Sequence, residues 1–457
     1  MDLGEEKNPI TDLQLVNFTL HDGENIQLEI PNTVYPPRED TSLMYEAMEN
    51  IQIDGTAIEI GCGSGILSIL MAKKNWSVRA YDVNPYAVMA ARKNSANHSV
   101  EDKVTFAEGG LGEQDFTISK NTSLIFWNLP YLNPPLDNEP RLAWMEEASM
   151  SDLPGKGWGH LLADFLEENM DKVQQNLLVI LLQRKYPTSP SNTNYWIKNG
   201  WSHRILKSKW IQNEKLEVVA YWKPGQETSP IEIESCLSTM DEAKKLPKIG
   251  WQRVLAEIQT GGRGRREKTW FSDEKDLVAT WNINKKILEK IQPGIIQILI
   301  GSKIAGLVEQ YNKWPNDIVD KNGKKIGGIL IEMDNESDFI RIGIGINHSD
   351  KMIEGIETTG WKEKKPNISK NDLFNMVDAV LSTLFEEHEL LKHNLPSNYV
   401  DSESWRGLSK LLSRGHTLRL NGKETRVIGI NKEGELVLLL DEKKVVNDSL
   451  DKMQWLF

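Results

Sequence analysis

The sequence predicts a doubly wound α/β domain, then an α+β domain with a mixed sheet, and finally a small all-β domain. Short apolar runs alternate with helical patterns between residues 56 and 222, which is typical of a parallel sheet with helices on both faces. After residue 230 the apolar runs have a different rhythm, and short strand-like segments follow residue 405. The segment 224–230, Pro-Gly-Gln-Glu-Thr-Ser-Pro, indicates a linker. We therefore expect domains at residues 1–225, 226–404 and 405–457.

Five apolar runs are expected to form the strands of the first domain. They are Ala57–Ile60, Val78–Tyr81, Val104–Phe106, Leu124–Trp127 and Leu177–Leu182. Between them, Asn84 followed by Pro85 suits an N-cap and a first helical position, and predicts a helix that runs through Asn97.

The second half should contain a mixed sheet and three helices. The expected strands are Val254–Ala256, Leu277–Ile283, Ile326–Ile331 and Phe339–Ile346, with a hairpin turn at Asn322-Gly323. Helical patterns cover about Met240–Leu246, Gly294–Glu309 and Asp372–Leu391. The small all-β domain should contain strands at His416–Leu420, Thr425–Ile430 and Leu436–Asp441.

Composition excludes several classes of protein. The 457 residues are 39% hydrophobic and 26% charged, which is an ordinary globular mixture. The longest unbroken apolar run, Leu177–Leu182, is far shorter than the roughly 20 residues of a membrane span. Acidic residues follow Met1, which is the wrong charge for a signal peptide, and two cysteines provide no disulfide framework. We expect a soluble, reduced, cytoplasmic protein that has no membrane partner and no metal-ligating cluster.

The charge of the chain argues against binding to DNA. Residues 1–225 carry 20 Lys and Arg against 30 Asp and Glu, a net charge of −10. Residues 226–457 carry 34 against 36, a net charge of −2. Neither half has the basic excess expected of a protein that binds duplex nucleic acid.

A glycine-rich turn is expected between the first strand and its helix. Glu59-Ile60-Gly61-Cys62-Gly63-Ser64-Gly65 gives the backbone the freedom to turn tightly and to approach a ligand. Asp82 ends the next strand, where a carboxylate can accept hydrogen bonds from two ribose hydroxyls. This pattern resembles the class I S-adenosylmethionine methyltransferases. The resemblance implies a Rossmann-like fold and cofactor contacts from Glu59, Gly61, Gly63, Gly65 and Asp82.

A second motif indicates the kind of methyl acceptor. Asn128-Leu129-Pro130-Tyr131 resembles the (N/D)PPY motif of methyltransferases that act on planar amino groups. The lone pair of such a nitrogen is delocalised, so an Asn oxygen and a neighbouring carbonyl must accept its hydrogens to localise that pair. The resemblance makes Asn128 and Tyr131 the catalytic candidates, with Tyr131 stacked on the flat group.

An upstream segment narrows the resemblance to one subgroup. Tyr35-Pro36-Pro37-Arg38-Glu39-Asp40-Thr41 is similar to a signature of the release-factor glutamine methyltransferases of archaeal and eukaryotic type. The similarity covers about residues 15–223 and implies that Thr41 lies over the donor site. It also implies a class 1 release factor and a small zinc-binding activator subunit as partners. This chain has Gly109-Gly110-Leu111 where the family has Gly-Asp-Leu.

An alternative acceptor remains open for this half. The Asn-Leu-Pro-Tyr spelling also occurs in adenine dimethylases of ribosomal RNA, which the net charge of −10 and the Glu-Asp-Thr segment disfavour.

The second half contains five ordered motifs that resemble those of the biotin–protein ligases. Alone, the loop Gly261-Gly262-Arg263-Gly264-Arg265-Arg266 suits anion binding no better than it suits a solvated basic turn. The resemblance rests on the order of five motifs. They are Ser238-Thr239, Gln259 with this loop, Lys313-Trp314-Pro315-Asn316-Asp317, Lys325-Ile326-Gly327-Gly328-Ile329-Leu330 and Gly343-Ile344-Gly345-Ile346-Asn347.

The resemblance implies a role for each group of residues. Lys325 would neutralise the biotin carboxylate and the α-phosphate, and Asp317 would lie near magnesium or the incoming lysine. Trp314 is expected in the core. The remaining biotin- and ATP-binding candidates are Ser238, Thr239, Gln259, Gly262, Arg263, Gly264, Arg265, Arg266, Trp270, Lys313, Asn316 and Asn347.

The whole chain is thus expected to be a bifunctional enzyme, a biotin–carboxyl carrier protein ligase joined to a methyltransferase. The cofactors implied are S-adenosylmethionine, biotin, ATP and Mg²⁺, a biotin carboxyl carrier domain is the expected partner, and the C-terminal domain should be an SH3-like barrel. A lipoate ligase shares the catalytic fold, but the arginine–glycine loop and Lys-Trp-Pro-Asn-Asp belong to the biotin branch. A non-catalytic scaffold is favoured only by Glu267, Gly110 and Leu129, which depart from the family motifs.

Overall fold

The computed structural model describes residues 13–51, 54–133, 151–153, 155–226, 228–264, 269–288, 291–334, 337–353 and 355–457. The chain divides into two compact units. The first unit comprises the residues up to 226 together with the short segment 388–392, and the second comprises residues 227–387 and 393–457.

The first unit contains a seven-stranded sheet in the order β5-β4-β3-β6-β7-β9-β8. Strands β3 to β7 are parallel, as expected, while β9 and β8 close one edge in antiparallel pairing. The strands of this unit are β1 Leu13–Thr19, β2 Asn25–Pro31, β3 Thr56–Ile60, β4 Ser77–Asp82, β5 Val104–Glu108, β6 Thr122–Asn128, β7 Leu178–Tyr186, β8 Ser202–Ile211 and β9 Glu214–Trp222. Its helices are α1 Glu39–Met48, α2 Ile66–Lys73, α3 Pro85–Asn97, α5 Trp158–Glu168, the 3₁₀ turn η1 Met170–Lys172 and α6 Thr193–Lys198.

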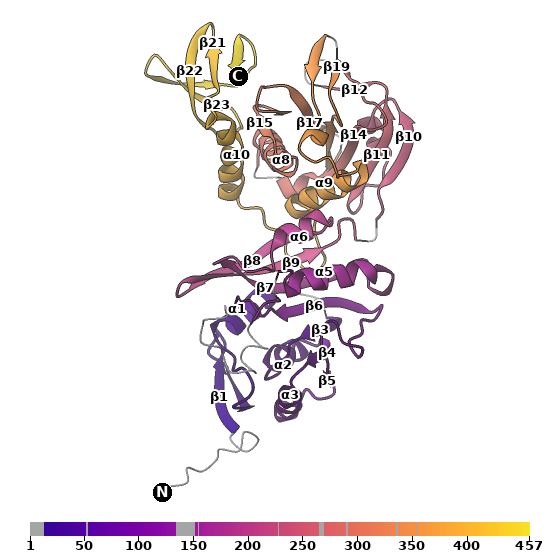
Figure 1. Cartoon of the computed structure of the whole chain (residues 1–457), viewed down its shortest axis with the longest axis vertical. Coiled ribbons are helices and arrows are strands. Elements are labelled where there is room, and N and C mark those ends of the chain that lie inside the picture. Colours follow the sequence, from indigo (N-terminus) through magenta and orange to yellow (C-terminus); the bar gives the residue numbers. More distant parts are fainter. Residues whose placement is uncertain are drawn as a thin grey trace. The chain divides into compact units, whose positions relative to one another are not determined.

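Helices cover both faces of this sheet (Figure 1). Alternate strand residues pack on α1, α2 and α3 in one core cluster and on α5 and α6 in another. The helix predicted from Asn84 and Pro85 is α3, and the Asn84 side chain accepts a hydrogen bond from the Tyr86 N–H at 3.0 Å. The doubly wound arrangement is therefore confirmed.

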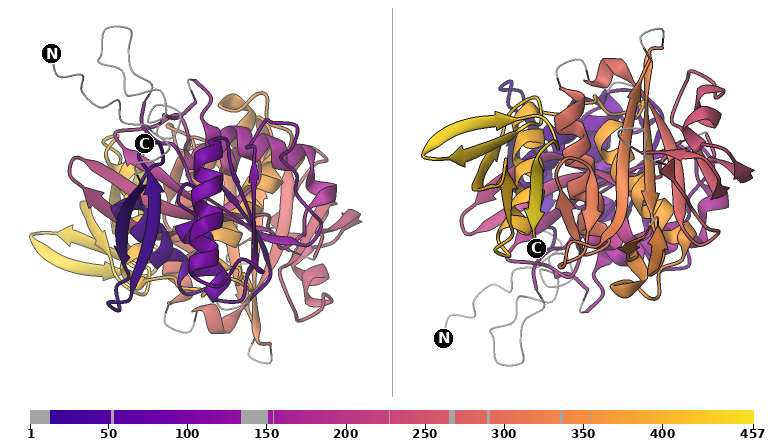
Figure 2. Two further views of the ribbon diagram at one scale, coloured as in Figure 1. Left: turned by 90° about the horizontal axis from the view of Figure 1, so that it is seen from below. Right: turned by 90° about the horizontal axis from the view of Figure 1, so that it is seen from above.

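A hairpin that the sequence did not indicate, β1–β2, lies beside α3 (Figure 2). The Asn94 side chain ties α3 to it, because its Oδ1 accepts from the Glu29 N–H at 2.9 Å and its Nδ2 donates to the Glu29 carbonyl at 3.2 Å.

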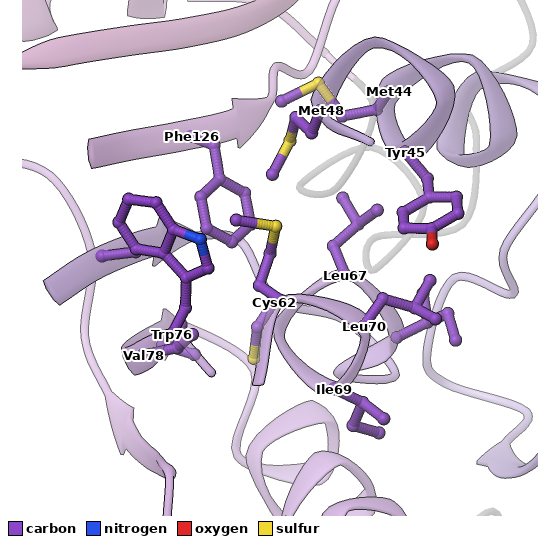
Figure 3. Packing of buried hydrophobic residues seen from close by; sticks show 14 of the residues in the cluster. Met44, Tyr45, Met48, Cys62, Leu67, Ile69, Leu70, Trp76, Val78 and Phe126 are labelled. Carbon is purple, nitrogen blue, oxygen red and sulfur yellow. The ribbon is translucent and has the colours of Figure 1, made fainter. Parts of the chain in front are cut away.

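The larger core cluster of this unit anchors the glycine-rich turn. Figure 3 shows Met44 and Met48 of α1 and Leu67 of α2 near Phe126 of β6 and Trp76, which are all buried. Cys62 of the turn is 4% exposed within the same cluster. The turn is thereby fixed to a rigid support.

The segment His388–Lys392 joins the core of the first unit, although it is distant in sequence. Leu390 and Leu391 are 3% and 9% exposed and belong to the same cluster as α1 and α2. The helix expected over 372–391 is consequently wrong in its last part: it ends at Phe385, and Glu386 is already extended. Burial of the two leucines outweighs the helical pattern of their sequence.

The second unit contains a mixed sheet whose main path is β10-β11-β14-β18-β17-β16-β15. Strands β10 and β11 are parallel, and the later pairs on this path are antiparallel. The strands of this sheet and of two small hairpins are β10 Ile231–Cys236, β11 Gln252–Gln259, β12 Gly262–Arg263, β13 Thr269–Trp270, β14 Leu277–Asn284, β15 Tyr311–Lys313, β16 Asp317–Val319, β17 Lys325–Met333, β18 Phe339–Ile346, β19 Lys351–Ile353 and β20 Ile356–Thr358. The helices are α7 Thr239–Lys244, η3 Lys285–Leu288, α8 Pro293–Leu307, η4 Trp361–Glu363, α9 Lys370–Phe385 and α10 Ser397–Leu412.

One face of this sheet is packed and the other carries the polar residues. Alternate residues of β14 and β18, such as Trp281 and Ile342, pack against α8 and α9. Thr280 and Asn282 are the intervening residues of β14, and they link the polar face to α7. The Thr280 hydroxyl donates a hydrogen bond to the Thr239 hydroxyl, and the Asn282 side chain donates one to the Ala243 carbonyl. The predicted turn Asn322-Gly323 connects β16 and β17, with Gly323 at φ +83°.

The C-terminal region forms a five-stranded antiparallel sheet (Figure 2, yellow). Its strands are β21 Thr417–Leu420, β22 Lys423–Ile430, β23 Leu436–Leu440, β24 Lys443–Asn447 and β25 Met453–Leu456. Three of the five were expected. The proposed boundary at residue 404 falls within α10, a helix that the sequence analysis missed. Trp314 is 2% exposed and packs in the core of this sheet, as expected.

Within the residues described, no helix combines the length and the apolar character that crossing a membrane requires.

Candidate active sites

The carboxyl ends of the central strands in the first unit open into a cavity of about 420 Å³. Ligands of open α/β sheets bind at this edge. The cavity brings together seven of the eight residues that the sequence singled out in this half: Thr41, Glu59, Gly61, Gly63, Asp82, Asn128 and Tyr131.

The eighth residue, Gly65, shapes the turn beside the cavity. Gly61, Gly63 and Gly65 all have positive φ, at +68°, +52° and +82°. A Cβ on Gly65 would lie 2.8 Å from the Cβ of Ala91 on α3. Gly65 is therefore required for the packing of the turn against a helix.

Asp82 holds the turn from the neighbouring strand. Its Oδ2 accepts the Gly63 N–H at 2.8 Å and its Oδ1 accepts the Asn84 N–H at 2.9 Å. Burial raises the pKa of Asp82, and these two hydrogen bonds oppose the rise. A carboxylate has about four acceptor positions, so Asp82 retains two for hydroxyl groups of a ligand.

Glu59 lies beneath the same turn. It is 3% exposed, and its Oε2 accepts hydrogen bonds from the N–H and the hydroxyl of Ser68 in α2. Burial raises the pKa of Glu59 to about 8, although the bonds from Ser68 lower it. Glu59 thus fixes α2 to β3 while one edge of its carboxyl group borders the cavity.

Asn128 lies at the end of β6, and its side-chain amide makes a hydrogen bond through the nitrogen and none through the oxygen. Its Nδ2 donates to Oδ2 of Asp40 at 3.0 Å. Asp40 is 4% exposed, and its Oδ1 accepts the Thr41 N–H at 2.7 Å. The Oδ1 of Asn128 is buried and makes no hydrogen bond. Because an amide cannot exchange its two ends while Nδ2 is bound, the arrangement presents an acceptor at the cavity.

Aromatic side chains border the acceptor end. Tyr131 lines the cavity, and burial together with the charge of Asp40 raises the pKa of its hydroxyl, which keeps it neutral. Trp127 and Trp158 also line the cavity, and their ring centres are 6.0 Å apart. Leu129 is 1% exposed and donates its N–H to the Leu182 carbonyl at 3.3 Å, a bond that a proline could not make.

Gly110 stands where the related family has an aspartate, and Glu113 lies close enough to supply a carboxylate in its place. A Cβ on Gly110 would lie 3.0 Å from Cγ1 of Val83, so a larger residue there would crowd the cavity wall. Glu113 lines the cavity one turn further along, beside Gly110 and Leu111. An exposed carboxylate is thereby supplied from position 113.

In the second unit, Thr239 and Gln259 are joined by hydrogen bonds, and Ser238 precedes Thr239. The Gln259 Oε1 accepts the Thr239 N–H at 2.8 Å and its hydroxyl at 3.0 Å. Ser238, which precedes α7, is completely buried, and its hydroxyl makes no hydrogen bond. Buried polar atoms are usually paired, so this hydroxyl suits a ligand with a polar group.

The β12–β13 hairpin brings Trp270 onto the same face. A Cβ on Gly345 of β18 would lie 2.5 Å from the Trp270 ring, so the indole packs directly on that glycine. The Nζ of Lys325 is 5.4 Å from the centre of the ring, within the range of a cation–π contact. The Nε1 of Trp270 is buried and unpaired.

Lys325 is held by Asp317. The Asp317 Oδ1 is 2.8 Å from the Lys325 Nζ, and its Oδ2 is 3.4 Å from the Lys313 Nζ. Burial alone would raise the pKa of Asp317, but the two ammonium groups outweigh it and lower that pKa. Asp317 therefore positions Lys325, and the Asn316 amide fixes the turn by donating to the Ile329 carbonyl at 3.1 Å.

Arg263 is engaged by two carboxylates. Its Nη1 is 2.7 Å from Asp241 Oδ2, and its Nε is 2.7 Å from Glu332 Oε1. The Arg263 charge lowers the pKa of Asp241 to about 2. Gly264 follows, while Arg265, Arg266 and Glu267 lie outside the described residues.

The last member of the set is Asn347, directly after β18. It is completely buried, and neither its Oδ1 nor its Nδ2 has a hydrogen-bond partner. Ser238, Trp270 and Asn347 thus each carry a buried polar atom without a hydrogen-bond partner.

Comparison with known proteins links each unit to a family. The family model of the ribosomal protein L11 methyltransferase (PrmA) matches residues 38–128. The model of the biotin/lipoate A/B protein ligase family matches residues 244–347.

Individual relatives agree with both matches. The "Putative protein N5-glutamine methyltransferase" of Methanocaldococcus jannaschii is 27% identical over 201 residues, which is 44% of this chain and 97% of the relative. The "Release factor glutamine methyltransferase" of Dictyoglomus turgidum is 32% identical over 25% of this chain and 46% of its own length. The "Bifunctional ligase/repressor BirA" of Bacillus spizizenii is 29% identical over 43% of this chain and 65% of its own length. The chain thus spans less than two thirds of the last two relatives.

The chain is a fusion of a methyltransferase-like half and a biotin-ligase-like half. We refer to the first unit as the methyltransferase half and to the second as the ligase half.

Sequence reasoning missed several residues of these two halves. In the methyltransferase half they are Asp40, Trp127, Trp158 and Glu113; in the ligase half they are Asp241 and Glu332. Asp40 belongs to the segment from Tyr35 to Thr41 that carries the resemblance, and its place in that motif was the signal that could have identified it. Glu332 gives no such signal, because it meets Arg263 only through the folding of β17 against the β12–β13 hairpin.

Proposed function

We propose that the ligase half activates biotin with ATP and transfers the biotinyl group to a lysine of a biotin carboxyl carrier domain. The observation that carries this proposal is the meeting of Lys325, Trp270 and Gly345 over one face of the sheet. In the first step a carboxylate oxygen of biotin attacks the α-phosphorus of ATP, and pyrophosphate leaves. In the second step the lysine amine attacks the acyl carbon, and AMP leaves.

The residues of the chain supply charge, position and exclusion of water. Lys325 neutralises two anions that are brought together, and Asp317 holds its ammonium group in place. Ser238 and Asn347 offer their unpaired polar atoms to the ring of biotin, while Thr239 and Gln259 fix the wall beside it. The β12–β13 hairpin with Trp270 covers the site, which protects a mixed anhydride from water. Mg²⁺ would accompany the phosphates of ATP and offset their charge.

The test is biotin-dependent exchange between ATP and pyrophosphate, measured on the full chain. We expect exchange with biotin and none with lipoate. Exchange supported by lipoate alone would assign this half to the other branch of the matched family. Transfer of labelled biotin to a purified carrier domain measures the second step.

For the methyltransferase half we infer transfer of a methyl group from S-adenosylmethionine to a side-chain amide nitrogen of a protein. The observation that carries this inference is the buried, unpaired Oδ1 of Asn128, whose other amide atom is bound by Asp40. An amide nitrogen becomes nucleophilic when its hydrogens are accepted in one fixed direction. The Asn128 oxygen and the Leu129 carbonyl can accept them. The nitrogen would then attack the methyl carbon, the sulfonium sulfur would leave with the bonding electrons, and the nitrogen would lose one proton to solvent.

Two partners follow from this inference. The glutamine of a class 1 release factor is the proposed acceptor, and the Dictyoglomus relative bears the name of such an activity. A small zinc-binding activator subunit is the second proposed partner.

The test is transfer of labelled methyl from S-adenosylmethionine to purified release factor, with ribosomal RNA as the rival acceptor. Labelled protein is the expected result. Labelled RNA with unlabelled protein would refute the amide assignment and support adenine dimethylation.

Glu113→Gln should weaken the binding of S-adenosylmethionine. If the Glu113 carboxylate accepts from the adenine amino group in place of an acid at position 110, its loss should raise the Kd by about threefold to tenfold. Calorimetry on the full chain measures this Kd. Glu108 is the last residue of β5 and does not line the cavity, so Glu108→Gln is the matched control. Equal affinities for the two variants would mean that Glu113 makes no contact with the donor.

Asp241→Asn should make Arg263 more available to ATP. Because Asp241 and Glu332 compete with phosphate for the guanidinium, removing one of them should lower the KM for ATP by about twofold to fivefold, the scale of an exposed ion pair. Glu242→Gln is the control, since Glu242 pairs with Lys245 and not with Arg263. A raised KM would instead mean that Asp241 holds Arg263 in its working position.

A further inference from the structure

The ligase half contains a second cavity, separate from the biotin and ATP residues. Its volume is about 220 Å³. It lies at the C-terminal end of α7, whereas Ser238 and Thr239 lie at the start of that helix. Asn282 of β14 and Arg341 of β18, which are direct neighbours in the sheet, form part of its wall.

Two buried polar groups in this wall lack partners. Arg341 is 6% exposed, and its Nε makes no hydrogen bond. Its ion pair with Glu332 joins Nη2 to Oε2 at 3.7 Å, longer than a hydrogen bond. Asn282 is 7% exposed, and its Nδ2 donates to the Ala243 carbonyl at 2.9 Å, which leaves its Oδ1 unpaired. Since buried polar groups are normally paired, a donor and an acceptor left over in one cavity indicate a ligand.

The cationic side chains of the lining favour an anionic ligand. Lys244 is paired with Asp241 at 2.9 Å and Arg341 has Glu332 at 3.7 Å, so the positive charge offered to a ligand comes from Lys248 and from the N–H groups of Arg341, while Asp334 contributes one negative charge. A guanidinium offers several N–H groups in a fixed plane that suits the oxygens of an anion. The Asn282 oxygen, in contrast, repels an anionic oxygen and accepts only an O–H or N–H.

We propose that this cavity binds a small oxyanion that also carries a hydrogen-bond donor. Arg341 holds the anionic oxygens, Lys248 adds long-range attraction, and Asn282 accepts from the O–H or N–H. Protonated phosphate, a phosphate monoester, or a carboxylate with a neighbouring hydroxyl or amino group shares this chemistry.

Inorganic phosphate and sulfate separate the two parts of this proposal. At neutral pH phosphate retains a P–O–H, whereas sulfate has no proton to donate. Calorimetry on the full chain should give phosphate an affinity about tenfold or more above that of sulfate, since one hydrogen bond to Asn282 is exchanged for a repulsion. Equal affinities for phosphate and sulfate would overturn the role of Asn282. If neither ion binds at about 10 mM, a concentration at which even a weak site would be occupied, the proposal is wrong.

Variants locate the site. Lys248→Glu should weaken phosphate binding about tenfold, whereas Lys245→Glu, which makes the same change of charge on an exposed residue outside the cavity, should not. Arg341→Gln should abolish binding, and an unchanged circular dichroism spectrum and Tm would exclude misfolding as the cause. Equal behaviour of the two lysine variants would place the phosphate outside this cavity and refute the proposal.

Discussion

Lys325→Ala is expected to reduce biotin-dependent ATP–pyrophosphate exchange by about 10²-fold or more, the scale of losing one electrostatic contact to a transition state. The ammonium group lies 2.8 Å from Asp317 and 5.4 Å from the centre of the Trp270 ring, whereas the Lys313 ammonium group is 3.4 Å from the other oxygen of Asp317. Alanine would leave two anions without neutralisation and Asp317 without its closer partner. The measurement is the exchange rate at saturating biotin and ATP in the full chain.

The adjacent lysine provides a matched control for this experiment. Lys324 is partly buried and pairs with Glu357, so Lys324→Ala makes the same change of side chain without removing a residue of the proposed site. We expect its exchange rate to be close to that of the wild type. Similar losses in the two variants would indicate a general effect of charge or folding, and a near-normal Lys325→Ala would refute the proposed role.

Asn128→Ala is expected to reduce methyl transfer by about 10²-fold or more while S-adenosylmethionine binds with near-normal affinity. In the proposed function Asn128 faces the methyl acceptor through its unpaired Oδ1, and other residues hold the donor. Asp82→Ala should show the reverse: the donor Kd should rise on the order of tenfold to 100-fold, because charge-assisted hydrogen bonds are lost. Calorimetry gives the affinity, and labelled methyl transfer gives the rate.

The pair of variants makes this prediction specific. An equal loss of donor affinity in both would mean that Asn128 supports the fold of the cavity and not the acceptor. Asp40→Asn provides a third comparison. If the one oxygen of the new asparagine keeps the hydrogen bond from the Thr41 N–H, its amide nitrogen takes the place of Asp40 Oδ2 and cannot accept from the Asn128 Nδ2.

The parts of the fold set by local chemistry were predictable from sequence. The strands from β3 to β7 follow apolar runs, and the start of α3 follows from Asn84 and Pro85. The glycine-rich turn was also predictable, because three residues with positive φ require glycine. These features depend on neighbours within a few residues.

The parts that depend on distant contacts were not predictable. Asp40 and Asn128 are 88 residues apart and meet only because α1 lies beside the end of β6. The end of α9 was misplaced for the same kind of reason, since the burial of Leu390 and Leu391 is not visible in a helical pattern. The ion pair of Arg263 with Glu332, 69 residues away, belongs to the same class.

The path of the chain gives the fusion a property that two domains joined end to end would lack. Residues 388–392 complete the core of the methyltransferase half after the chain has already built most of the ligase half. A cut at the linker would therefore remove two leucines from that core, each contributing about 1.5–3 kcal/mol when fully buried. The core of the methyltransferase half thus depends on five residues that follow more than 160 residues after residue 226, and a fragment that ends at residue 226 would lack them.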